Sequence, residues 1–214
     1  MSISDKRKSG KRMKLEREAE KKREELQNII KSSFSQFNIY IENIHDISQK
    51  IIEKFTDITP PEIDITIHLI TMEHWSRGAR SSKPGNIWLN WRKLLIDGAE
   101  SILTITGAAI VPWLIPLAGL IVWNKVWSLL NIEIDERHAV VIWVMWRNRD
   151  KENCIKEREI LDAVNDELKK YNRPEMSPKE LEDILKDLEK MECIEKIQDE
   201  NKWWLREWVK VAYE

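Results

Sequence analysis

Histidine and cysteine are the side chains here that could bind a metal or attack a substrate, and their spacing favours neither role. His68 and His74 lie six residues apart with Glu73 between them, which is neither HExxH nor another spacing typical of metal ligands. Cys154 and Cys193 lie 39 residues apart, and the chain has no CxxC pair. Free thiols are therefore a simpler interpretation than a disulfide framework or a zinc ribbon. We predict no metal and no cofactor.

Signatures of the common catalytic classes are missing from the sequence. It contains no GxSxG motif, no P-loop, no Rossmann fingerprint and no Cys/His pair in a credible context. Acidic residues are plentiful, but none lies in an apolar stretch that would shift its pKa towards neutrality. We therefore predict that the protein is not an enzyme.

An uncharged run, Ser101–Asn124, is the most distinctive stretch, because 34% of the whole chain is charged. About 20 apolar residues is the length that a bilayer-spanning helix needs. The segment before the run reads as an interfacial helix beginning at Ile87 and capped by Asn86. Trp123, Lys125 and Trp127 at the exit of the run match the headgroup level. The residues assigned to this membrane segment are Trp88, Trp91, Pro112, Trp113, Pro116, Trp123 and Trp127.

Two prolines inside the run leave its arrangement open. Pro112 and Pro116 would kink or break a continuous helix. The run is then a kinked single span, a re-entrant hairpin, or a buried hairpin of a helical domain outside any membrane. Basic residues are more numerous before the run than just after it, and this asymmetry predicts that the N-terminal region is cytoplasmic. Membrane lipid is the partner that the apolar run itself predicts.

The part before the run divides by charge and periodicity. Residues 1–31 carry 11 basic and 6 acidic side chains, and residues 1–14 read as a basic flexible arm. Residues 15–56 are predicted to be helical. An apolar stripe in their second half is suited to a partner helix, either within the chain or in a homo-oligomer. Residues 57–86 are a linker region whose segment 62–75 fits a strand as well as a helix, and 87–130 hold the membrane segment.

Residues 133–214 are acidic, with 16 basic and 22 acidic side chains. Apolar stripes predict helices to Arg147 and over Glu157–Tyr171. Ser177, Pro178 and Glu180 form a capping box that starts a third helix ending near Met191. Two alternating strands around a polar turn follow as a hairpin. This order resembles a winged helix-turn-helix domain over about residues 135–212. The predicted fold is thus mainly α: a helical N-terminal region, an apolar membrane-type helical segment, and a C-terminal winged helix with a two-stranded β-hairpin wing.

The resemblance implies binding of either DNA or protein, and the charges favour protein. The third helix carries more acidic than basic side chains and has no Arg, Asn or Gln for base contacts. We therefore expect a membrane-associated adaptor that docks a protein partner. A pore-forming or membrane-perturbing oligomer and a membrane-tethered DNA-binding regulator are the alternatives, with nucleic acid the less favoured partner. The candidate partner-binding residues are Lys179, Asp183, Lys186, Trp203 and Trp208.

Overall fold

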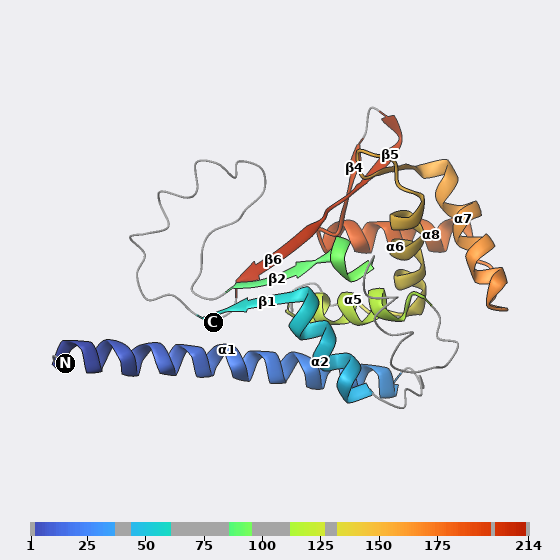
Figure 1. The fold of residues 1–214 in the computed structure, drawn as a ribbon. Coiled ribbons are helices and arrows are strands. Elements are labelled where there is room, and N and C mark those ends of the chain that lie inside the picture. Colours follow the sequence, from blue (N-terminus) through green and yellow to red (C-terminus); the bar gives the residue numbers. More distant parts are fainter. Residues whose placement is uncertain are drawn as a thin grey trace.

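Six stretches of the chain are described by the computed structural model: residues 3–36, 44–60, 86–95, 112–126, 132–197 and 200–212. Over these residues the protein is mainly helical, with two small antiparallel sheets (Figure 1). His68, His74 and Trp127, together with the predicted linker from residue 61 to 85, lie outside the described residues.

The base of the molecule is formed by α1 (Ile3–Gln36), which packs against α2 (Ile44–Phe55) and α5 (Leu114–Val126) (Figure 1). Its second half buries Leu26, Ile30 and Phe34 at spacings of four, so one stripe of the helix faces the core. The predicted flexible arm is wrong for residues 3–14, which are helical. Lys, Arg and Met favour helix strongly enough to carry it past Gly10. The apolar stripe predicted for the second half of residues 15–56 falls largely on α2, which packs against α1 of the same chain. Self-association stays a prediction.

The first sheet joins segments far apart in the sequence, in the order β1-β2-β6. Its strands are β1 (Thr56–Thr59), β2 (Asn86–Asn90) and β6 (Trp208–Ala212). The central strand pairs antiparallel with both neighbours and buries Ile87 and Leu89 completely. The interfacial helix predicted to start at Ile87 is therefore wrong, because residues 86–90 form a strand whose side chains alternate between the sheet faces. Of the described residues of that segment, only 91–95 are helical.

The described part of the uncharged run is a core helix, so the predicted membrane-type helical segment is wrong. Helix α5 has 13 residues, about 20 Å at 1.5 Å per residue, against about 30 Å for a bilayer core. Every residue from Trp113 to Trp123 is buried, and α1, α2 and α6 pack around the helix. Among the described helices, none combines the length and apolarity needed to cross a membrane.

Three of the tryptophans assigned to the membrane, Trp91, Trp113 and Trp123, contact other parts of the protein instead. Trp113 Nε1 donates to Glu136 Oε1 at 2.8 Å, and Trp123 Nε1 donates to the Met191 carbonyl oxygen at 2.7 Å. Trp91 is fully buried, and its ring lies so close to Gly119 that a Cβ there would be 3.1 Å from Cζ3. Trp88 lies in β2, and its side chain is outside the described part of the structure.

The two prolines do not interrupt α5, the described helix of this run. Pro112 lies in the turn that precedes α5, and Pro116 is the third residue of α5. The amides of the first helical turn have no intrahelical acceptor, so a proline there costs no hydrogen bond. The predicted kink at Pro116 is therefore wrong for α5, whereas a hairpin turn depends on residues 101–111, which lie outside the described residues.

The C-terminal part runs α6 (Glu136–Asn148), β3 (Cys154–Lys156), α7 (Glu157–Lys170), α8 (Pro178–Lys190), β4 (Ile194–Ile197) and β5 (Lys202–Leu205). Its sheet has the order β3-β5-β4. The three helices, the capping box at Ser177 and the β4–β5 hairpin are confirmed. The residues of β3 lie in a segment for which the sequence predicts only a polar connection. The single strand predicted from Lys202 onwards is in fact two strands, because β5 belongs to this sheet and β6 to the first (Figure 1).

Candidate functional site

A groove of about 920 Å³ lies between the start of α7, one face of α8 and the β4–β5 hairpin. The α8 residues along it are spaced three and four apart, which places them on one side of that helix. Its apolar lining is made of Leu161, Pro178, Leu181, Leu185 and Trp203. Leu181, Leu185 and Trp203 are each less than a tenth exposed, so they are core side chains whose outer surface forms the floor of the groove.

The rim of the groove carries four basic and four acidic side chains: Lys156, Arg158, Lys186, Lys196, Glu157, Glu182, Glu189 and Glu200. Lys186 Nζ lies 2.6 Å from Glu182 Oε1, and Lys196 Nζ lies 2.8 Å from Glu157 Oε2. Lys156 Nζ is 3.3 Å from Glu159 Oε1, just outside the rim. Each of these lysines therefore already has a carboxylate neighbour.

The hydrogen bond between Glu182 and Lys186 moves the pKa values of both groups away from neutrality. The hydrogen bond with Lys186 lowers the pKa of the Glu182 carboxyl, and the same contact raises the pKa of Lys186. Both groups stay charged near pH 7. General acid–base catalysis needs a pKa close to the working pH, so this pair is suited to charge pairing with a ligand and not to proton transfer.

Trp203 anchors the hairpin side of the groove. Its side chain is 4% exposed, and the Lys196 ammonium lies 5.4 Å from its ring centroid. In β5 it pairs in register with Ile155 of β3 and Lys196 of β4. Trp203 is therefore both a core residue and the aromatic part of the groove surface.

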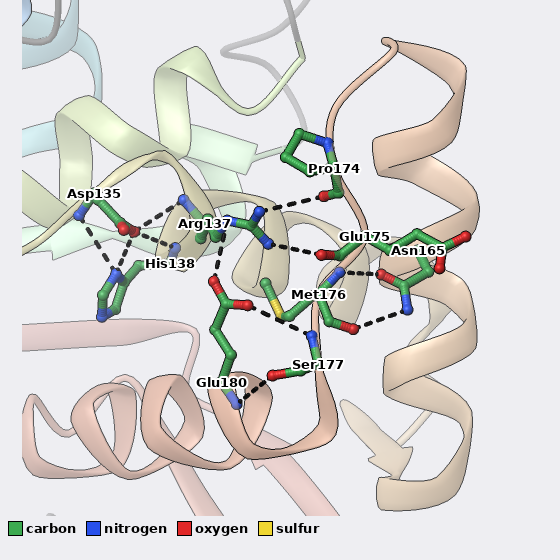
Figure 2. A network of polar contacts seen from close by, with 9 residues as sticks. All are labelled: Asp135, Arg137, His138, Asn165, Pro174, Glu175, Met176, Ser177 and Glu180. Atoms are coloured by element: carbon green, nitrogen blue, oxygen red, sulfur yellow. Dashed lines mark hydrogen bonds and ion pairs between the residues drawn. The ribbon is translucent and has the colours of Figure 1, made fainter.

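A polar network fixes the start of α8 and so the position of the groove (Figure 2). Arg137, from α6, points between the carbonyl oxygens of Pro174 and Glu175 at 3.3 and 3.5 Å. Its Nε lies 3.1 Å from Glu180 Oε1. Ser177 Oγ accepts from the Glu180 amide at 3.2 Å, which is the capping box predicted from the sequence. One arginine thus joins α6, the α7–α8 connection and the first turn of α8.

A second anchor on the connection comes from α7. Asn165 donates through Nδ2 to the Met176 carbonyl at 3.1 Å and accepts the Met176 amide through Oδ1 at 2.7 Å (Figure 2). This two-bond match satisfies both backbone groups of a residue between two helices. The Met176 side chain is buried, so the connection is fixed by packing as well as by hydrogen bonds.

Lys179 and Asp183 lie away from the groove, along a hollow of about 330 Å³ between α8 and the start of α6. His138 lies in this hollow with a side chain only 8% exposed. Its Nδ1 is 2.7 Å from Asp135 Oδ1, and its Nε2 is 3.7 Å from Asp187 Oδ2. Burial acts to raise the pKa of Asp135, but the contacts with His138 and the Arg137 amide outweigh it and lower that pKa.

The structure therefore separates the predicted partner-binding residues. Lys186 and Trp203 line the groove, whereas Lys179 and Asp183 line the hollow. Trp208 begins β6 in the other sheet, and its side chain is outside the description. Sequence reasoning missed Leu161 and Lys196 as groove residues, although the apolar stripe of α7 and the alternation in β4 were signals for both.

Within the described residues, no three His, Cys, Asp or Glu side chains are grouped so that they could hold a metal ion. No protein-family profile, curated protein or solved structure matches the chain. The candidate site therefore rests on its own geometry and charges.

Proposed function

We propose that residues 132–212 contain a winged-helix module that binds another protein through the groove between α7, α8 and the β4–β5 hairpin. The order of helices and strands and the arrangement β3-β5-β4 support a winged helix. Winged helices serve many roles, so the function must be argued from the site.

The observation that carries the proposal is the internal pairing of charges around an apolar floor. Binding to nucleic acid depends on lysine and arginine side chains that neutralise phosphates. Here Lys156, Lys186 and Lys196 each lie within 3.3 Å of a glutamate oxygen. A duplex would have to displace those carboxylates or accept them beside its own phosphates. A protein surface with both signs of charge and apolar side chains suits this rim and floor better.

The shape favours a partner helix laid along α8. The groove follows α8 from Pro178 to Glu189, about 16 Å or three helical turns. Helices bind in such grooves through apolar side chains spaced three, four and seven residues apart. Leu181, Leu185 and Trp203 would receive these side chains, while the rim ion pairs exchange with charges on the partner.

Site-directed photo-crosslinking tests the proposal. A photoreactive amino acid at Lys186, in cells that make the full chain, is expected to give a discrete protein adduct. The same amino acid at Lys170 is the matched control, since Lys170 is an exposed helical lysine on α7 outside the groove. Reversing a rim charge with Glu182→Lys should weaken the adduct formed at Lys186.

Two results would contradict the proposal. One is equal crosslinking from Lys186 and Lys170, which would indicate random collisions. The other is binding of duplex DNA by the full chain, with an affinity that falls steeply as salt rises and is lost in Lys186→Glu. That salt dependence is the signature of phosphate contacts and would assign the groove to nucleic acid.

A further inference from the structure

A third cavity, of about 430 Å³, lies where the two sheets meet and is separate from the groove and from the hollow beside His138. Three basic side chains line it: Arg92, from the helical turn after β2, and Arg149 and Lys151, from the connection between α6 and β3. Asp150, Asn153 and Glu207 complete the lining. Residues 57 positions apart thus bring two guanidinium groups and an ammonium group to one cavity.

Arg149 is held in place, but among the described residues no carboxylate oxygen lies within 4.0 Å of its guanidinium nitrogens. Its guanidinium lies 4.5 Å from the centroid of the Trp146 ring. Its Nε donates to Asn153 Oδ1 at 3.1 Å, and its Nη1 donates to the Trp146 carbonyl oxygen. The other arginines of the described C-terminal residues each have a carboxylate oxygen within 4.0 Å: Arg137, Arg147, Arg158, Arg173 and Arg206.

The acidic residues of the cavity are already engaged. Glu207 Oε1 accepts from Arg92 Nη1 at 3.2 Å and from Asn153 Nδ2 at 3.3 Å. Asp150 Oδ1 accepts the amides of Glu152 and Cys154, both at 2.9 Å, which closes the turn before β3. Burial lowers the pKa of Arg149, the nearby charge of Arg92 lowers it further, and the charge of Glu207 offsets only part of this lowering. The two arginines therefore repel each other across a cavity with too little negative charge to balance them.

We infer that this cavity binds the phosphoryl group of a small molecule between Arg92, Arg149 and Lys151. Guanidinium groups present forked N–H donors that match the oxygens of a phosphoryl group, and a lysine adds a point charge. The volume lies within the range of small-molecule sites, so it has room for more than the phosphoryl group itself. The bound group would bridge Arg92, next to the first sheet, and the connection that leads into the second.

Titration of the full chain with inorganic phosphate tests the inference, with chloride at the same ionic strength as the reference. We expect saturable binding by isothermal titration calorimetry and a rise in melting temperature that chloride does not produce, since a ligand that binds only the folded state stabilises it. Arg149→Gln should weaken phosphate binding by about 10- to 100-fold, the usual size of a hydrogen bond to a charged group. Lys151→Gln, an exposed turn residue, should weaken it without affecting folding.

The sharpest variant is Glu207→Gln, which removes a competing negative charge and keeps an oxygen for Arg92 and Asn153. It should tighten phosphate binding, an effect that loss of folding cannot mimic. Arg147→Gln is the matched control: it also removes an arginine that lies over a tryptophan, Trp143, at 5.7 Å, but outside the cavity. Phosphate binding that is equal in wild type, Arg149→Gln and Arg147→Gln, or unchanged in Glu207→Gln, would overturn the inference. Glycerol phosphate and acetate as further ligands distinguish a phosphoryl site from a general anion site.

Discussion

Replacing Trp123 by phenylalanine tests whether this indole lies in the protein core or at a membrane surface. The side chain is 1% exposed, and its Nε1 donates to the Met191 carbonyl at 2.7 Å. Phenylalanine lacks the donor and three ring atoms. Losing the hydrogen bond costs about 0.5–1.5 kcal/mol, and the lost packing adds about 0.8 kcal/mol for each buried methylene-sized group. With the small cavity that remains, we expect a loss of about 2–4 kcal/mol in the free energy of unfolding.

Urea titration followed by far-UV circular dichroism measures this loss, and an unchanged dependence on urea would show that the same surface is exposed. Trp204→Phe is the matched control, because the Trp204 ring in β5 is only partly buried; we expect a loss below about 1 kcal/mol there. A loss below about 1 kcal/mol for Trp123→Phe would refute the core position, since an indole at a lipid surface has neither this packing nor a protein carbonyl as acceptor.

Three further outcomes follow from the same packing. Cys154 and Cys193 are free and buried, and burial raises the pKa of both thiols, so neither should react with a disulfide reagent until urea unfolds the chain. Asp135→Ala should cost about 1 kcal/mol at pH 7 as the loss of a helix cap. The pKa of Asp135 in the folded protein lies below its unfolded value of about 3.9. The cost of the substitution should therefore persist above about pH 3.9 and shrink as the pH falls through the lowered pKa. Melting temperatures of both proteins from pH 7 to 2 would show this. Gly119→Val should cost about 1–3 kcal/mol, since a Cβ there would meet Leu94 Cδ2 at 2.4 Å, whereas Gly10→Ala, in open space, should stabilise α1 by about 0.5–1 kcal/mol; equal melting temperatures for the two variants would contradict the close packing of α5.

Local patterns predicted the C-terminal helices well. Ser177, Pro178 and Glu180 mark the start of α8 because a cap depends on residues only three positions apart. The apolar stripes of α7 and α8 and the alternation in β4 and β5 are likewise properties of short windows. Two of the groove residues, Lys186 and Trp203, followed from them. The rest of the groove depends on how α7 packs beside α8, which no window of either helix contains.

The uncharged run shows where such patterns stop being sufficient. A helix that is apolar on all sides fits a bilayer and a protein core equally well, and the run has the composition for both. Its burial is decided by α1, α2 and α6 around α5, together with the acceptors that Glu136 and Met191 supply to its two tryptophans. None of these neighbours can be read from the run itself.

The sequence alone therefore determined the mainly helical composition, the capped helices and the hairpin, because each follows from the spacing of nearby residues. Tertiary structure decided the rest. It paired β2 with β6 across more than 110 residues, enclosed α5, and brought Arg92 to Arg149. Long-range pairs of this kind depend on which surfaces exclude water together, and that is a property of the whole folded chain.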